Sequence, residues 1–488
     1  MALPPWFMDS ARALIRADSV SAQGNQAALA VLEPLYVKAG LSTQRFSWRE
    51  SIDGAPDSLH SNLLAGPGGG HAEGAMGGVL FVTHSDTVPT GPLERWTETG
   101  GDPRALTEKD GWLFGLGVAD VKLDALCKIA AAERLLGKKL ARPFWLCATA
   151  AEEVGLRGAR RFAESAEFKA LEIREVLCGE PSELQLIRAH KGYAVVVCTI
   201  TDLNPPQVEK QAVRELAFEG KAAHSSTPHL GDNAIHRALQ WAHEVGAPVL
   251  SADGGASANT VPALCTLLVP AAAAEQSHGA NVHEVEASSG PDLLRAMQTA
   301  GALEELWISL VHKLLPASDP RFDPPGAVGG LNILKSIEEK AAPGATRGRA
   351  TVRATMDARL LPQHDPETLL VTFMAAAEAW VQRTGRGELS LRVEITRNAG
   401  GMSLGDHAPL LVRVSDTLAR LGLDPTAKAK PTSTEAGVFA RAGCEAIVIG
   451  PGRSTGNAHT ANERIEIAQL VRAVDLYESL LEDLCGRS

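Results

Sequence analysis

Five side chains of the types that bind divalent metal ions are spread across this sequence at suggestive positions. They lie at the end of an apolar run, shortly after one, or at the start of a helical pattern: His84, Asp120, Glu153, Glu180 and His459. Imidazole and carboxylate groups gathered at one site suit a divalent metal held by nitrogen and oxygen, and zinc above all. The residue types therefore predict a metal centre, provided that the fold brings distant positions together.

The elements that precede these residues explain how they could meet. Short apolar runs rich in β-branched residues cover residues 77–84, 143–153, 174–180 and 445–452, and a helical pattern starts at Asp120. Such runs between helical patterns predict buried parallel strands. Ligands bind beyond the carboxyl ends of the strands in such sheets. The sequence thus predicts an α/β fold whose strand ends carry the site.

Two local pairs add candidate chemistry. His84 and Asp86 are two apart, which on a strand places both on one face, so Asp86 could support the histidine or fix its tautomer. Glu152 and Glu153 are adjacent at a strand end, so one could bind metal while the other holds a proton. Each feature has a plainer interpretation: a turn aspartate, a solvated first helical turn, and for Asp120 an ordinary helix cap. Their joint occurrence beside strands favours the metal site.

Composition sets the broad class. The chain of 488 residues is too long for one ordinary core, so we expect two domains. Its 45% hydrophobic and 22% charged residues are typical of a soluble globular protein. The net charge of -11 argues against a nucleic-acid surface.

The N-terminus and the cysteines suggest a cytoplasmic protein. Asp9, Arg12 and Arg16 interrupt the apolar positions of the first helical pattern, which is unlike a signal peptide. No apolar stretch approaches the length of a membrane span, so we expect no membrane partner. The seven cysteines are odd in number and dispersed, which favours reduced thiols.

The pattern of helices and strands divides the chain. Residues 1–188 alternate helix and strand in the doubly wound manner, and this texture returns in residues 400–488. Residues 189–399 between them have the texture of a smaller inserted α+β domain. Within the insert, about 268–348 is rich in Ala, Gly, Pro and Ser and contains one convincing helix, which indicates an elaboration.

The motifs in this order resemble metallopeptidase family 20, which includes acetylornithine deacetylase, succinyl-diaminopimelate desuccinylase and the glutamate-releasing carboxypeptidases. The resemblance covers nearly the whole chain apart from about 268–348, and its motifs are HSDTVP, GVADVK, AEEVG, GEPS, GKAAHSSTPHLGDNAI and GPGRSTGNAHTANERI. It implies a doubly wound zinc-peptidase catalytic domain with an inserted α+β lid or dimerisation domain, and a homodimer.

The resemblance also assigns roles to the metal-site residues. It implies two divalent ions, zinc or alternatively cobalt or manganese, held by His84 and Glu180 on one side and by Glu153 and His459 on the other. Asp120 would bridge them. Glu152 would be the general base, taking a proton from a metal-activated water and passing it to the leaving nitrogen.

Three residues of the insert match substrate contacts in relatives. His224 would stabilise the oxyanion and come from the partner subunit, and Arg359 would grip a substrate carboxylate. Asn259 matches a polar substrate contact, although a turn asparagine is the plainer interpretation and Asn332 is a weaker rival.

The resemblance also implies a cis peptide between Asp120 and Val121. The chain departs from the family pattern where Leu116 replaces the usual arginine and where Leu123 and Asp124 replace paired glycines. Residues 433–437, STEAG, also differ from the usual Gly-Thr-Asp-Ala type. We expect the changes at Leu116, Leu123 and Asp124 to alter the packing around the bridging aspartate more than the activity, whereas the change at residues 433–437 affects the loop on the substrate side.

These observations predict an amidohydrolase that releases an amino acid from a small-molecule N-acyl amino acid, in the manner of a deacetylase or desuccinylase. A metallo-dipeptidase or carboxypeptidase with the same metals is the nearest alternative. A catalytically silent binding or assembly protein is the alternative from another class. Retention of Glu152 with all five ligands argues against the silent protein, since a silent descendant need keep none of them.

Overall fold

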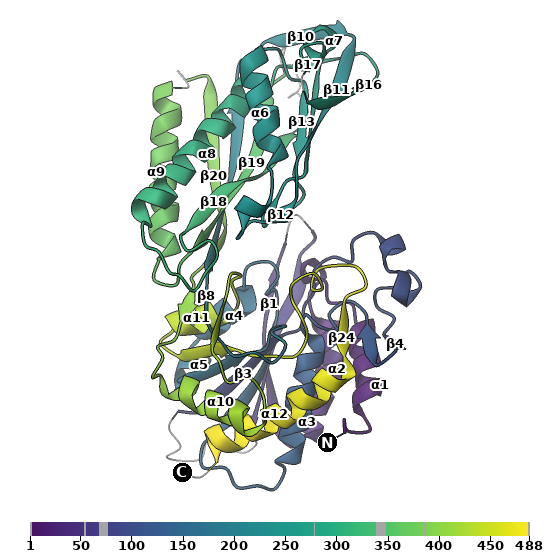
Figure 1. Cartoon of the computed structure of the whole chain (residues 1–488), viewed down its shortest axis with the longest axis vertical. Helices are drawn as coiled ribbons and strands as arrows, with labels where there is room; N and C mark the ends of the chain where they lie inside the picture. The colour runs from purple at the N-terminus through teal and green to yellow at the C-terminus, as the bar shows by residue number, and fades with distance from the viewer. Residues whose placement is uncertain are drawn as a thin grey trace. The chain divides into compact units, whose positions relative to one another are not determined.

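The computed structural model describes residues 2–52, 55–67, 77–277, 279–337, 348–384 and 387–486. The chain forms two compact units. Unit 1 comprises Met1–His190 and Met402–Ser488, and unit 2 comprises Lys191–Gly401. The colours of Figure 1 show that unit 1 joins the purple and blue beginning of the chain to its yellow end. The catalytic candidates His84 to Glu180 and His459 therefore belong to one unit.

Unit 1 is built on a nine-stranded mixed sheet in the order β1-β2-β6-β3-β7-β23-β8-β21, with β22 paired to β8. Its centre is parallel: β6 (Phe144–Thr149), β3 (Val79–His84), β7 (Glu175–Cys178) and β23 (Glu445–Val448). The first three are buried along their whole length, as expected for strands covered on both faces. The flanking strands β1 (Leu41–Glu50) and β2 (Ser58–Pro67) are antiparallel to their neighbours.

Helices cover both faces of this sheet. One layer shares the main hydrophobic core and consists of α1 (Phe7–Arg16), α2 (Gln26–Lys38), α3 (Lys122–Arg134), α10 (Pro409–Arg420) and α12 (Ile467–Cys485). The other contains α4 (Arg157–Glu164), α5 (Ala166–Ala170) and α11 (Ala436–Arg441), whose phenylalanines pack on one another. Sheet and helices together confirm the predicted doubly wound α/β class.

The shorter strands of unit 1 surround this frame. They are β4 (Thr107–Lys109), β5 (Trp112–Phe114), β8 (Ile187–His190), β21 (Met402–Ser403), β22 (Lys428–Lys430) and β24 (Arg464–Glu466). The strands β24, β5 and β4 form a small sheet of their own. This pairing ties the end of the chain to the segment before Asp120.

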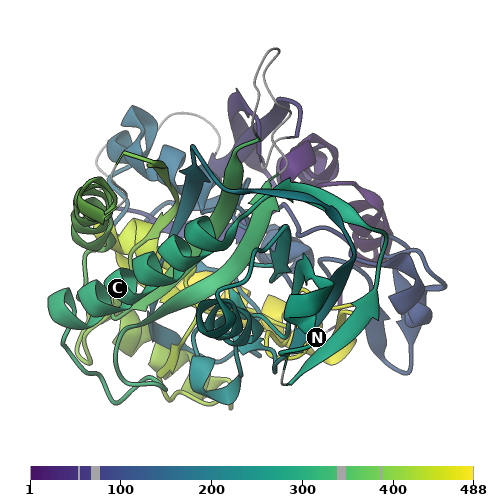
Figure 2. The ribbon, with the colours of Figure 1, turned by 90° about the horizontal axis from the view of Figure 1, so that it is seen from above.

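Unit 2 is an antiparallel sheet with helices packed on it, as the predicted α+β insert requires. The sheet order is β16-β11-β15-β13-β18-β19-β9-β20. Its strands are β9 (Gly192–Asp202), β11 (Val213–Glu219), β13 (Ser251–Gly254), β15 (Leu264–Pro270), β16 (Ala280–Glu284), β18 (Val328–Ile337), β19 (Ala350–Leu360) and β20 (Leu389–Ala399). The helices α6 (Ala234–Val245), α8 (Leu294–Leu314) and α9 (Pro366–Thr384) pack on these strands and on one another, and appear in teal and green in Figure 2.

The expected elaboration is part of this sheet. Between about 268 and 348 the structure places α7 (Ala271–Ala274), β16, β17 (Ser288–Pro291), α8 and β18, while residues 278 and 338–347 lie outside the described part. Across the described residues no helix is long and apolar enough to cross a membrane. All seven cysteines are buried and free.

Candidate metal centre

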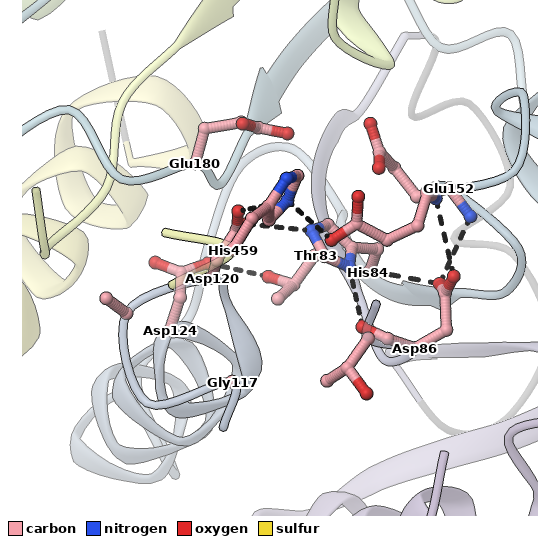
Figure 3. A network of polar contacts seen from close by, with 12 residues as sticks. Thr83, His84, Asp86, Gly117, Asp120, Asp124, Glu152, Glu180 and His459 are labelled. Carbon is pink, nitrogen blue, oxygen red and sulfur yellow. Dashed lines mark hydrogen bonds and ion pairs between the residues drawn. The ribbon is translucent and has the colours of Figure 1, made fainter. Parts of the chain in front are cut away.

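Three of the five candidate ligands lie where the parallel strands end. His84 is the last residue of β3, Glu153 follows β6, and Glu180 follows β7 by two residues. Because these strands are parallel neighbours, their carboxyl ends meet at one edge of the sheet. Figure 3 shows His84, Glu152 and Glu180 around one space, together with Asp120 and His459.

Asp120 lies between the two histidines. His84 Nε2 is 3.2 Å from Asp120 Oδ1, and His459 Nε2 is 3.1 Å from Asp120 Oδ2. His459 Nε2 is also 3.0 Å from Glu153 Oε1. Each carboxylate oxygen of Asp120 therefore faces a different imidazole, which is the arrangement that a bridging carboxylate needs.

Two overlapping groups of side chains could each hold a metal ion. In one, ligand atoms of His84, Glu152 and Glu153 lie within 4.8 Å of one another, and in the other, those of Asp120, Glu153 and His459 do. Glu180 belongs to neither group, and its Oε2 lies 3.1 Å from Lys430 Nζ. The sequence reasoning had not singled out Lys430, whose place on β22 gives no sequence signal of this partner.

Asp86 contacts His84 through its backbone carbonyl and not, as the spacing suggested, through its carboxylate. His84 Nδ1 lies 3.0 Å from the Asp86 backbone carbonyl but 3.8 Å from its carboxylate. The carboxylate instead accepts the backbone N–H groups of Glu152 and Glu153, at 3.1 and 3.4 Å, and the hydroxyl of Ser21 at 2.6 Å. The carbonyl thus favours a proton on Nδ1 and leaves Nε2 toward Asp120, while the carboxylate orients the loop with the two glutamates.

The crowding of acids gives the site unusual protonation behaviour. Desolvation raises the pKa of Glu152 well above its ordinary value, opposed by His84 and reinforced by Glu153 and Glu180. The charge of Glu153 raises the pKa of His459 to about 12, helped by Asp120. Burial would raise the pKa of Asp120, but hydrogen bonds from both histidines lower it. The acids outnumber the cations, so the cluster has a deficit of positive charge.

The loop that presents Asp120 is held by a residue that sequence reasoning missed. The Glu463 carboxylate accepts the backbone N–H groups of Gly117, Ala119 and Asp120, at 3.1, 2.8 and 2.9 Å. Its side chain is buried, and burial raises its pKa to about 7. The peptide between Asp120 and Val121 is cis, which confirms that prediction. Only the position of Glu463 four residues after His459 could have drawn attention to it.

A second overlooked acid lies in the segment that departs from the family pattern. Glu435, within residues 433–437, is buried directly before helix α11. Burial raises its pKa to about 7, partly offset by His84. Glu435 takes the place of the aspartate in the usual Gly-Thr-Asp-Ala pattern, so this segment still contributes a carboxyl group to the electrostatics of the metal-site cluster.

In unit 2, Arg359 is enclosed by aromatic and polar partners. Its guanidinium carbon lies 3.6 Å from the centre of the Tyr193 ring, and Nε and Nη2 each lie 3.2 Å from Ser225 Oγ. Arg359 Nε is 3.5 Å from Asp357 Oδ2, and burial raises the pKa of Asp357 to about 6. Asn332 donates to Asp357 Oδ1 at 2.8 Å, which makes it part of the same network.

His224 and Asn259 lie on paired short strands near this network. The strand β12 (Ala223–His224) pairs with β14 (Thr260–Val261). The Ser226 backbone N–H donates to His224 Nδ1 at 3.1 Å, so the proton of a neutral His224 ring is on Nε2. The Asn259 side-chain oxygen accepts from Ser257 and Thr260, as in a turn asparagine.

Comparison with known proteins decides the family. The profile of "Peptidase family M20/M25/M40" matches residues 80–483, most of the chain. The chain belongs to this family. It is 36% identical over 242 residues to acetylornithine deacetylase from Yersinia pestis, a match that covers 48% of this chain and 54% of that protein. The chain therefore spans about half the length of such relatives.

Solved structures share the fold at low sequence identity. The M20 family metallo-carboxypeptidase Sso-CP2 from Sulfolobus solfataricus has a TM-score of 0.60 at 15% identity, covering 98% of both chains. The aminoacylhistidine dipeptidase from Vibrio alginolyticus has a TM-score of 0.60 at 14% identity, covering 100% of this chain and 98% of that one. These likenesses show the fold, and the family match agrees with the predicted class of enzyme, one that acts on amide bonds.

Proposed function

We propose that the protein is a two-metal amidohydrolase that releases an amino acid from an N-acyl amino acid. The observation that carries the proposal is the position of Asp120 between His84 and His459, with a different carboxylate oxygen toward each. This geometry offers two adjacent ion positions joined by one residue. The match to acetylornithine deacetylases supports the choice of an N-acyl amino acid as substrate.

The donor set of the site fits divalent ions. His84 and His459 both direct Nε2 toward carboxylate oxygen, and the carboxylates of Asp120 and Glu153 are close enough to share an ion with an imidazole. Such a mixture of nitrogen and oxygen donors suits zinc, cobalt or manganese. We assign one ion to His84 and Glu180, the other to Glu153 and His459, and both to Asp120. When bound, the ions would polarise the amide carbonyl and acidify a water molecule.

Glu152 is the proton carrier of this scheme. Its carboxylate takes the proton of the attacking water and delivers it to the leaving amide nitrogen. Its pKa is raised above that of an ordinary glutamate by desolvation and by neighbouring carboxylates, which suits a group that must both accept and return a proton near neutral pH. Asp86 fixes its backbone through the N–H of Glu152.

Unit 2 supplies substrate recognition in the proposal. Arg359 binds the carboxylate of the released amino acid through a forked pair of N–H groups, a geometry that lysine cannot offer. His224 donates its Nε2 proton to the oxyanion of the tetrahedral intermediate. Asn259 contributes a backbone or amide contact nearby, with Asn332 as its rival. The homodimer and the supply of His224 by the partner subunit belong to the same proposal.

A substrate screen tests the proposal and separates its alternatives. The purified protein, loaded with zinc, cobalt or manganese, would be assayed against N-acetyl and N-succinyl amino acids and against dipeptides. Turnover of N-acyl amino acids above dipeptides supports the deacylase. The reverse preference would establish the dipeptidase or carboxypeptidase alternative, and metal binding without turnover of any substrate would favour a silent binding protein.

A further inference from the structure

A buried ion pair lies directly below the candidate metal centre. Asp124 and Lys128 stand one turn apart on α3, with Lys128 Nζ 2.6 Å from Asp124 Oδ2, and their side chains are 0% and 3% exposed. Buried charges are costly unless every donor and acceptor is satisfied. Neither residue belongs to the candidate ligand groups, and the proposed reaction assigns neither of them a role.

The pair is bonded to the end of β3 that carries His84. Lys128 Nζ donates to the Val82 carbonyl and to Thr83 Oγ1, each at 2.7 Å, and the Thr83 hydroxyl donates to Asp124 Oδ2 at 2.6 Å. With Asp124 itself, these contacts use all three protons of the ammonium group. Figure 3 shows the bond between Thr83 and Asp124 beside His84. The backbone immediately before His84 is therefore fixed by both members of the pair.

The same pair sets the position of the residue before Glu180. The Gly179 N–H donates to the Val82 carbonyl at 2.7 Å, so that carbonyl serves both Gly179 and Lys128. A β-carbon added at Gly179 would lie 1.9 Å from Asp124 Oδ2 and 2.6 Å from Lys128 Nζ. Only glycine allows the end of β7 to approach the pair this closely.

A third connection runs to the C-terminal part of unit 1. The Tyr477 hydroxyl of α12 bonds to Asp124 Oδ1, and it lies 3.1 Å from the carbonyl of Ile449, the residue after β23. Lys128 Nζ lies 5.3 Å from the centre of the Tyr477 ring. The helix that holds the pair begins two residues after Asp120. The network thus touches the segments that present His84, Glu180 and Asp120.

We propose that Asp124 and Lys128 are positioning residues that fix the segments carrying these three candidate ligands. The inference rests on the proposed two-metal function. Partners of ligands that lie outside the coordination sphere set ligand orientation, and their removal typically lowers metal affinity about 10- to 100-fold. Here the charged pair bonds to Val82 and Thr83, the two residues before His84, and lies against Gly179, the residue before Glu180, so that its loss displaces two ligands together.

The test measures metal binding, independently of turnover. Metal-free full-length protein would be titrated with Co²⁺ by calorimetry, and the visible absorption of the bound Co²⁺ would report ligand geometry. We expect Asp124→Asn and Lys128→Met to lower Co²⁺ affinity at least about tenfold and to change the spectrum. Thr83→Val, which keeps the shape of the side chain but removes the linking hydroxyl, should give a smaller loss in the same direction.

Glu175→Gln is the matched control. Glu175 is a buried acid at the opposite end of β7, paired with Arg142 at 2.8 Å and with Arg413, far along the strand from Glu180. It should lower the melting temperature without changing Co²⁺ affinity more than about twofold. If this control weakened binding as much as Asp124→Asn, the effect would be one of stability alone and the inference would be wrong.

The other possible results of the Co²⁺ titration also decide whether the inference holds. If Asp124→Asn and Lys128→Met fail to fold, Thr83→Val and Tyr477→Phe provide the answer, since both keep the charged pair intact. Wild-type protein that binds Co²⁺ together with variants that bind it equally well would overturn the inference and leave the proposed function standing. Wild-type protein that binds no Co²⁺ would overturn the proposed function and the inference with it.

Discussion

The two adjacent glutamates after β6 have different surroundings although they share a backbone turn. Glu153 Oε1 lies 3.0 Å from His459 Nε2, whereas the Glu152 carboxylate lies close to His84. The Asp86 carboxylate holds both backbone N–H groups, which fixes the direction in which each side chain leaves the chain. The proposed function uses this difference by assigning Glu153 as a ligand and Glu152 as the proton carrier.

Glu152→Gln should therefore abolish most turnover while leaving the metal content unchanged. Removing a general base typically costs about 10²- to 10⁴-fold in kcat, because the proton of the attacking water has no acceptor. Metal analysis alongside steady-state kinetics makes the measurement. The matched variant is Glu153→Gln, which should lose metal as well as rate. Normal turnover by Glu152→Gln would require the two roles to be exchanged.

A second prediction concerns the recognition of the substrate carboxylate by Arg359. Its guanidinium is already stacked on Tyr193 and bonded to Ser225, so it is held ready for a planar anion. Amidating the substrate carboxylate should cost the wild-type enzyme about 2 to 5 kcal/mol in kcat/KM, because the Arg359 guanidinium loses its charged partner. Arg359→Ala should lose this discrimination. An enzyme variant that still preferred the free carboxylate would place carboxylate recognition elsewhere.

Among the helices and strands, those that follow from a pattern of apolar residues were predicted from the sequence. The runs ending near His84, Glu153 and Glu180 are buried strands of one parallel sheet centre, and that topology alone gathers the three residues. The antiparallel direction of β1 and β2 was not predictable, because an apolar run contains no information about direction.

Buried charge was the other feature that the sequence could not reveal. The sequence marks Asp124 only as a departure from a glycine pattern, and nothing in the helical pattern distinguishes Lys128 from other lysines. Both are buried because their partners come from β3 and α12, the latter more than 300 positions away in the chain. Glu463 was missed for the same reason, since its three backbone donors precede it by a similar distance. Hydrogen bonds between residues so far apart in the chain depend on the fold and cannot be read from the local sequence.

Glu463 provides a prediction at this scale, because it joins the loop before α3 to the segment before α12. Glu463→Ala removes a carboxylate that accepts three buried N–H groups. Unsatisfied buried donors cost about 1 to 3 kcal/mol each, although water entering the space would reduce the total. We expect a lower free energy of unfolding and weaker metal binding through Asp120, measured by urea unfolding and by metal titration. Glu466→Ala, a nearby substitution without these bonds, should change neither quantity.

At the scale of the whole molecule, the candidate groups belong to two units with separate cores. The candidate metal ligands and Glu152 are in unit 1, and His224 and Arg359 are in unit 2. The chain leaves unit 1 after His190 and returns at Met402. One polypeptide is thus divided between a part that presents metal ligands and an insert that presents histidine and arginine, and the resemblance predicts that the histidine acts on the site of the partner subunit.

Mixing two inactive variants tests this last prediction. Glu152→Ala and His224→Ala dimers should each be inactive, because every site lacks one required group. After dissociation and reassociation, a hybrid dimer has one site with both substitutions and one with neither, provided that His224 crosses to the partner. Random pairing makes half of the dimers hybrids, so the mixture should recover about a quarter of wild-type activity. Native mass spectrometry would verify that hybrids formed. Hybrids without activity would mean that His224 serves its own chain, since both sites would then remain defective.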